Sequence, residues 1–168
     1  NSLMIYISTQ NRRHSYYAGH VRVSEFTHPM NQSIASAARF YALRLAPGQE
    51  LLTELRQFIR HHGLQAAWIA GCTGSLTEVA LRYAGREEST RLCGTFEVIS
   101  LAGTLELTGE HLHLSIADEK GALLGGHVMP GCTVRTTLEL VIGELTVLSF
   151  SRKPCPLSGY DELVVNPR

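Results

Sequence analysis

The most informative pattern in the chain is a strict alternation of polar and apolar residues over residues 111–117, which read His-Leu-His-Leu-Ser-Ile-Ala. Side chains of an extended strand point alternately to its two faces, so the pattern predicts a strand with its leucines and isoleucine on one face. His111 and His113 then share the other face, with their backbones roughly 6–7 Å apart. This spacing lets both imidazoles converge on one metal ion.

A turn and a returning strand are predicted directly after this strand. Residues 118–121 read Asp-Glu-Lys-Gly, which is typical of a turn, and residues 124–127 read Leu-Gly-Gly-His. Glycine allows two backbones to approach closely, so the glycine pair can place His127 beside the first strand.

Three histidines in this arrangement predict a metal site with one open coordination position, formed by His111, His113 and His127. The expected cofactor is a divalent metal ion; zinc fits imidazole ligands best, and nickel, copper and iron are alternatives. The competing interpretation is that the three are ordinary polar residues on a wet sheet face.

Elsewhere the pattern predicts one helix and about seven strands. Apolar residues follow helical spacing from residue 49 to Gly63, a glycine typical of a helix end. A Lys-Pro-Cys-Pro run at residues 153–156 is expected to end the sheet, and residues 160–168 to form a short tail on the surface. The predicted fold class is therefore α+β, a largely antiparallel, curled sheet with one main helix packed on it.

The chain has 168 residues, which is the length of one ordinary domain. Residues 1–35 show no sustained periodicity and are predicted to be an N-terminal arm or leader, with a single domain and its short tail over residues 36–168. No apolar run is long enough to span a membrane, and residues 3–7 are too short for a signal-peptide core. The four cysteines lack the C-x-x-C spacing, so we expect free thiols in a reducing compartment and a cytoplasmic protein.

The charge balance of the chain bears on nucleic-acid binding. The formal net charge is +0, whereas domains that bind DNA through their charge are usually basic. We therefore expect direct binding to nucleic acid to be weak.

Three segments resemble, in order and spacing, the PPC ("plants and prokaryotes conserved") domain family. They are Arg-Leu-Ala-Pro-Gly-Gln-Glu at residues 44–50, Gly-Thr-Phe-Glu-Val-Ile-Ser-Leu-Ala-Gly at residues 94–103, and the histidine segment from His111 to His127. The resemblance covers roughly residues 38–150 and implies a bacterial stand-alone member that forms a homotrimer. It also implies that the three histidines are metal ligands, as in bacterial members.

The same resemblance links the chain to DNA, because plant members carry the domain behind an AT-hook, a short basic motif that binds the minor groove. No Arg-Gly-Arg-Pro core of such a hook occurs in this chain. Plant members also use a Gly-Arg-Phe-Glu-Ile-Leu motif to contact partner proteins, and Thr95 replaces its arginine here. The corresponding interaction motif is Gly94, Thr95, Phe96, Glu97, Val98 and Ile99.

Two functions are consistent with these observations. The first is a trimeric metal-binding module that is DNA-binding or transcription-associated by family resemblance, with a protein partner or a small-molecule ligand. The second is a metal-dependent, hydrolase-like enzyme for a small molecule, in which metal-bound water is the nucleophile. Glu97 is then the candidate catalytic residue, for proton transfer or support of an imidazole; the competing interpretation, a hydrogen-bonded structural carboxylate near a subunit contact, is preferred for it.

Overall fold

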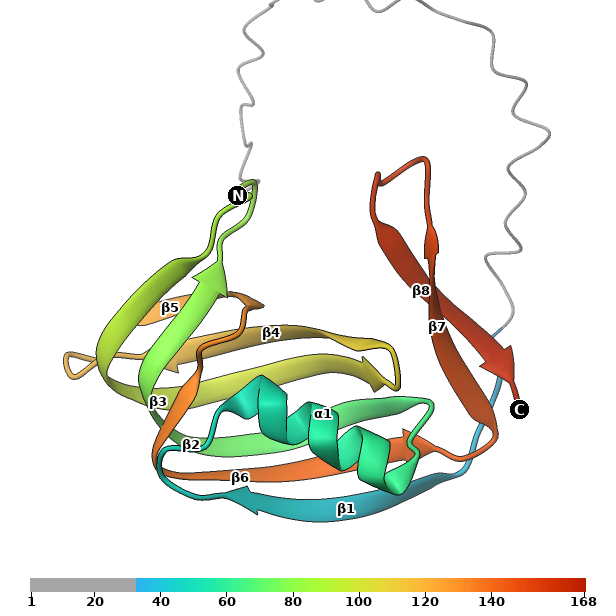
Figure 1. The fold of residues 1–168 in the computed structure, drawn as a ribbon, viewed down its shortest axis with the longest axis horizontal. Coiled ribbons are helices and arrows are strands. Elements are labelled where there is room, and N and C mark those ends of the chain that lie inside the picture. The colour runs from blue at the N-terminus through green and yellow to red at the C-terminus, as the bar shows by residue number, and fades with distance from the viewer. Residues whose placement is uncertain (1–32) are drawn as a thin grey trace, which may run out of the picture. The chain divides into compact units, whose positions relative to one another are not determined.

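Eight strands and one helix make up residues 33–168, the part of the chain described by the structure, a computed structural model (Figure 1). In chain order they are β1 (Ala38–Leu45), α1 (Leu51–His62), β2 (Ala67–Arg82), β3 (Thr90–Glu106), β4 (Gly109–Ala117), β5 (Leu123–Val128), β6 (Thr133–Leu145), β7 (Leu148–Pro154) and β8 (Asp161–Pro167).

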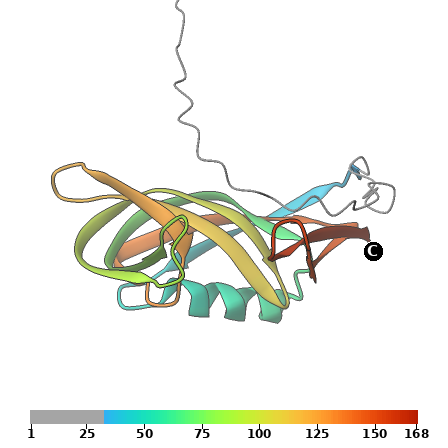
Figure 2. The ribbon, with the colours of Figure 1, turned by 90° about the horizontal axis from the view of Figure 1, so that it is seen from above.

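Six of these strands form one antiparallel sheet in the order β1-β6-β2-β3-β4-β5. The far end of β2 pairs with β5 as well, through Leu81 with Val128 and Arg82 with His127. This extra pairing closes β2, β3, β4 and β5 into a ring, and the resulting curvature is visible in Figures 1 and 2. The predicted antiparallel, curled sheet is therefore confirmed.

The predicted α+β class is wrong, because the structure is mostly antiparallel sheet, with 62% strand and 9% helix. Two stretches of the chain form strand where the sequence did not predict it. β2 runs without a break through the glycine-containing segment 71–75, where register shifts absorb the irregularity, and the tail at residues 160–168 supplies β8. The 12-residue helix α1 makes only about three turns, so it is too short to form a layer over a six-stranded sheet.

The helix itself lies where helical spacing predicted it. It ends at Gly63, which adopts the left-handed conformation at φ 61° and donates its N–H to the carbonyl of Arg60. At its start, the Glu50 side chain accepts a hydrogen bond from the Thr53 N–H at 2.8 Å. Its apolar stripe joins the hydrophobic core through Leu51, Leu52, Leu55 and Ile59.

The alternation in β4 also has the predicted outcome. Leu112, Leu114 and Ile116 are buried in the core, whereas His111 and His113 are exposed on the opposite face. The predicted turn at residues 118–121 follows, with the Gly121 N–H donating to the carbonyl of Asp118.

Strands β7 and β8 form a separate two-stranded antiparallel sheet, so the predicted surface tail is instead one strand of a hairpin. Just before this hairpin, the fully buried carboxylate of Glu144 binds two arginines from opposite ends of the described chain. Arg39 in β1 donates to it at 2.7 Å, and Arg168 donates to its other oxygen.

Most of the predicted N-terminal arm, residues 1–35, lies outside the described residues. Among residues 33–168, no helix has the length and apolar character needed to cross a membrane.

We predict that Gly103→Ala destabilises the domain. Gly103 has φ 138°, and a Cβ built on it would lie 1.9 Å from the carbonyl oxygen of His111 on the paired strand. Strain in the backbone and overlap with β4 should lower the free energy of unfolding by about 2 kcal/mol or more, measured by denaturant titration.

The matched control is Gly109→Ala, because no heavy atom lies within 4 Å of a Cβ at that position. The control should change the stability by less than about 0.5 kcal/mol. Equal stability of the two variants would contradict the prediction.

Candidate metal centre

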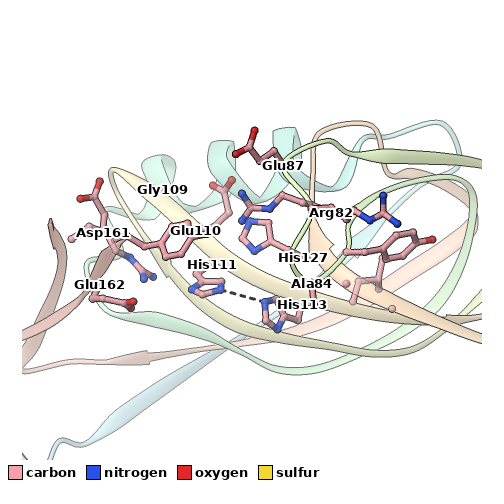
Figure 3. Close-up of a pocket in the computed structure, with 18 of the residues that line it drawn as sticks. Arg82, Ala84, Glu87, Gly109, Glu110, His111, His113, His127, Asp161 and Glu162 are labelled. Atoms are coloured by element: carbon pink, nitrogen blue, oxygen red, sulfur yellow. Dashed lines mark hydrogen bonds between the residues drawn. The ribbon is translucent and has the colours of Figure 1, made fainter. Parts of the chain in front are cut away.

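The pairing of β4 with β5 brings the three predicted histidines together. His113 lies directly opposite His127 in this pairing, and His111 precedes His113 by two residues on the same face. The ring centroids of His111 and His127 are 5.1 Å apart, and those of His113 and His127 are 5.7 Å apart. One nitrogen from each ring lies within 4.8 Å of the other two (Figure 3).

The distance between two of these nitrogens fits a tetrahedral ion. The Nε2 atoms of His111 and His113 are 3.3 Å apart. Two nitrogens that each bind a tetrahedral zinc ion at about 2.0–2.1 Å are about 3.3–3.4 Å from one another. The separation of this pair, which is a hydrogen-bond contact between the two rings in Figure 3, therefore also fits two ligands of one zinc ion, and His127 offers a third nitrogen within 4.8 Å of both.

The surroundings of the site favour the neutral form of two imidazoles. Burial lowers the pKa of His111, and the positive charges of His113, Arg152 and Arg82 lower it further. Burial and then the Arg82 guanidinium lower the pKa of His127 as well. Because neutral imidazole is the form that binds metal, the environment keeps both rings ready to act as ligands near neutral pH.

The glycine pair has the predicted structural role of allowing close backbone approach. A Cβ on Gly126 would lie 2.8 Å from the carbonyl oxygen of Arg82, and a Cβ on Gly125 would lie 3.0 Å from that of Leu114. Side chains at these positions would push β5 away from both neighbouring strands, and His127 would move with it.

A cavity of about 1250 Å³ lies beside the histidines. Charged and aromatic residues from three parts of the chain line it, namely Arg82, Tyr83, Arg86 and Glu87 around the end of β2, Glu106 and Glu110 around the β3–β4 turn, and Arg152, Tyr160, Asp161 and Glu162 from the β7–β8 hairpin. Sequence reasoning did not identify these residues; apart from Glu110, which directly precedes His111, and Glu106, shortly before it, they are brought near the histidines by the packing of segments distant in the chain.

Two of the acidic residues in the cavity wall are held by arginines. Glu110 accepts hydrogen bonds from Arg56. Glu106 accepts one from Arg152 Nε at 2.9 Å, and its side chain is 1% exposed. Its other oxygen, Oε2, is the one buried side-chain oxygen or nitrogen without a hydrogen-bond partner among the described residues.

The structure does not bring Glu97, the candidate catalytic residue, to the histidines. Glu97 is exposed on β3 opposite Ala117, five residues away from Ala102, the partner of His113. Five residues of strand span roughly 16 Å. The interaction motif around it lies entirely within β3, with Phe96 and Val98 buried and Ile99 exposed.

Comparison with known proteins gives matches in both sequence and structure. A model of the Plants and Prokaryotes Conserved (PCC) domain matches residues 32–146. A hypothetical protein from Salmonella enterica of known structure is 70% identical, with a TM-score of 0.80 over 80% of this chain and 98% of that one. A metal-containing protein from Archaeoglobus fulgidus, 21% identical, shares the fold, with a TM-score of 0.67 over 79% of this chain and 96% of that one.

A curated relative is much longer than this chain. The bifunctional protein GlmU of Synechococcus sp. (strain JA-3-3Ab) is 44% identical over 125 residues, which cover 74% of this chain and 20% of that protein. The chain thus spans about a fifth of the length of the curated relatives it matches.

We predict that His111 and His127 of the metal-free protein titrate below pH 6.5, the ordinary midpoint of histidine. NMR of their ring protons across a pH series measures this, with a histidine in an unstructured peptide as the reference. As the pH decreases, the histidines of the unfolded chain bind protons at a higher pH than those of the folded chain. The free energy of unfolding should therefore also fall as the pH decreases through about 6.5. Midpoints at or above that of the reference would contradict the prediction.

Proposed function

The chain belongs to the Plants and Prokaryotes Conserved domain family, which is the PPC family that its three motifs resemble. We propose that, within this family, the chain is a metal-binding module. In this proposal His111, His113 and His127 bind one divalent ion, with zinc as the best match. The proposal rests above all on the 3.3 Å between the Nε2 atoms of His111 and His113, which suits two ligands of one tetrahedral ion. The metal content of the Archaeoglobus fulgidus protein, which has the same fold, also supports it.

The second part of the proposal concerns the open position of the ion. Three protein ligands leave one position of a tetrahedral ion free, and the histidines lie in the wall of a cavity of about 1250 Å³. When bound, the ion would act there as a Lewis acid toward an oxygen of water or of a ligand. The arrangement therefore suits a module that binds a small molecule through the metal.

We favour a binding module over a hydrolase-like enzyme. An enzyme of that kind needs a carboxylate or imidazole that is free to transfer protons beside the metal. Glu97 lies roughly 16 Å along β3 from Ala102, the residue opposite His113. Glu106 and Glu110, which line the cavity, are each bound by an arginine, and Asp161 and Glu162, which form no ion pair within residues 33–168, lie on the hairpin after the family match.

We also propose that this domain does not bind DNA tightly by itself, although its family is linked to DNA. Phosphate binding needs unpaired cationic side chains on one surface. Within residues 33–168, four arginines are instead paired with carboxylates, namely Arg39, Arg56, Arg152 and Arg168. Together with a net charge of +0, this pairing means that the chain has no overall excess of positive charge to attract a DNA backbone.

A homotrimer is the assembly that we propose, as the family resemblance implies. Large apolar side chains are exposed on four strands of the main sheet, including Phe40 at 61%, Ile99 at 54% and Val141 at 41%. β1 is an edge strand of this sheet, and a neighbouring subunit can cover such an edge.

We predict that sedimentation at micromolar concentration gives three times the 18.5 kDa of one chain. The physical reason is that burial of the exposed apolar side chains favours association. A monomer at this concentration would refute the proposed trimer.

We predict that His113→Ala loses most of its metal. The variant lacks one of three ligands, and its zinc affinity should fall by at least about tenfold, since even a residue that only supports a ligand has an effect of that size. The test is elemental analysis of zinc-loaded, tag-free protein. The fold should survive, because the His113 side chain is exposed.

His61→Ala is the matched control, since His61 is an exposed histidine at the end of α1 and does not line the cavity. It should keep the zinc content of the wild type. Equal metal content in all three proteins, or none in any of them, would show that the three histidines are ordinary surface residues.

A further inference from the structure

The β7–β8 hairpin begins after residue 146, the last residue that the family model matches, and it forms one wall of the cavity beside the histidines. Arg152 on β7 and Tyr160, Asp161 and Glu162 at the start of β8 line this wall. The histidines lie on the shared family fold, so the hairpin is a separate contribution to the same site.

Strand β7 of the hairpin is fixed to β3, the strand that pairs with the histidine strand. Arg152 Nε donates to Glu106 at 2.9 Å, and its Nη2 donates to Thr104 Oγ1 at 2.8 Å. Thr104 lies directly opposite His111 in the β3–β4 pairing. In addition, the Phe150 N–H donates to the carbonyl of Gln65 at 2.8 Å. The hairpin therefore holds its side chains at a defined place relative to the histidines.

The charged side chains that form no ion pair include one cation beside His127 and two acids on the hairpin. Arg82 lies opposite His127 in the β2–β5 pairing and has no ion pair within residues 33–168. Figure 3 shows Asp161 and Glu162 on one side of His111 and Arg82 on the other. Neither of these two acids forms an ion pair within the described part of the chain.

A buried atom at the acidic end gives independent evidence for a ligand. Oε2 of Glu106 is buried without a hydrogen-bond donor, although Glu106 lines the cavity. A buried acceptor without a donor is unfavourable, so a ligand that supplies an N–H or O–H there would gain affinity. An ammonium group carries three N–H donors, so it can serve more than one carboxylate at this end of the cavity.

We propose that the cavity binds a small zwitterionic molecule of the amino-acid class. Its carboxylate takes the open position of the metal and contacts the Arg82 guanidinium, a side chain suited to planar oxyanions. Its ammonium group binds at the hairpin end, to Glu106, Asp161 and Glu162. The carboxylate half of this inference rests on the metal site proposed above.

The cavity has room for such a molecule. Its volume of about 1250 Å³ far exceeds that of a single ion. Sites for small molecules usually have volumes of about 300–1,000 Å³, so the cavity has space for a small molecule.

The test uses zinc-loaded protein and three series of probes in calorimetric titrations. The first series is the ω-amino acids from glycine to 6-aminohexanoate, and the others are the straight-chain carboxylates and alkylamines of matched length. At least one ω-amino acid should bind about tenfold more tightly than the carboxylate and the amine of the same length, because it adds charge-assisted hydrogen bonds at the second end.

Two variants locate each end of the ligand. The double variant D161N/E162Q keeps the shape of both exposed side chains but removes their charge. It should reduce severalfold the ratio of the affinity for an ω-amino acid to the affinity for the carboxylate of the same length. The affinity for the carboxylate itself should not change. Arg82→Gln should lower the binding affinity for ω-amino acids and for carboxylates by the same factor. The control is Glu119→Gln, since Glu119 is an exposed acid in the β4–β5 turn outside the cavity wall.

The zinc content of each protein is measured before titration, which separates this inference from the proposed function. If zinc binds but ω-amino acids bind no better than carboxylates, the zwitterion inference is wrong and the metal site stands. If D161N/E162Q still binds ω-amino acids more tightly than carboxylates by the same factor as the wild type, the ammonium group does not bind at the hairpin. If the wild-type protein binds no zinc, both proposals fail.

Discussion

The close approach of β5 to its two neighbours is the constraint on which the site depends. β5 is only six residues long, yet it pairs with β4 on one side and with the end of β2 on the other. Gly126 makes this approach possible, because a Cβ there would lie 2.8 Å from the carbonyl oxygen of Arg82. The same contact places His127 beside His113 and Arg82 beside His127. Backbone packing therefore arranges the metal ligands and the nearest cation together.

The parts of the site that the sequence predicted are those determined by local rules. Alternation placed His111 and His113 on one face, and the glycine pair after a short turn indicated how His127 could return to them. The β2–β5 pairing joins residues more than forty positions apart in the chain, and no periodicity in either segment reveals it. Arg82 was missed for that reason, and the hairpin residues were missed because their strand was expected to be a surface tail.

The fold class was missed for a related physical reason. The small residues of segment 71–75 are compatible with a bend, a bulge or a close packing contact, and β2 continues through them because register shifts accommodate the irregularity. Gly74, at φ 141°, lies so close to the backbone of Thr137 that a Cβ there would be 2.1 Å from its carbonyl oxygen. Glycine thus maintains strand pairing here, although the same residue type often ends a strand. Local composition does not distinguish these two roles.

The buried carboxylate of Glu144 has a consequence for how this domain can be combined with others. It binds Arg39 at the start of β1 and Arg168 at the last residue of the chain, so the two ends of the described domain lie side by side. A domain with adjacent ends can be inserted into a loop or attached to a second domain without distortion of either partner. The presence of a homologous segment in proteins about five times as long as the matched stretch is consistent with a domain that can be joined to others in this way. One ion-pair cluster would then stabilise this domain and also make it compatible with many different neighbours.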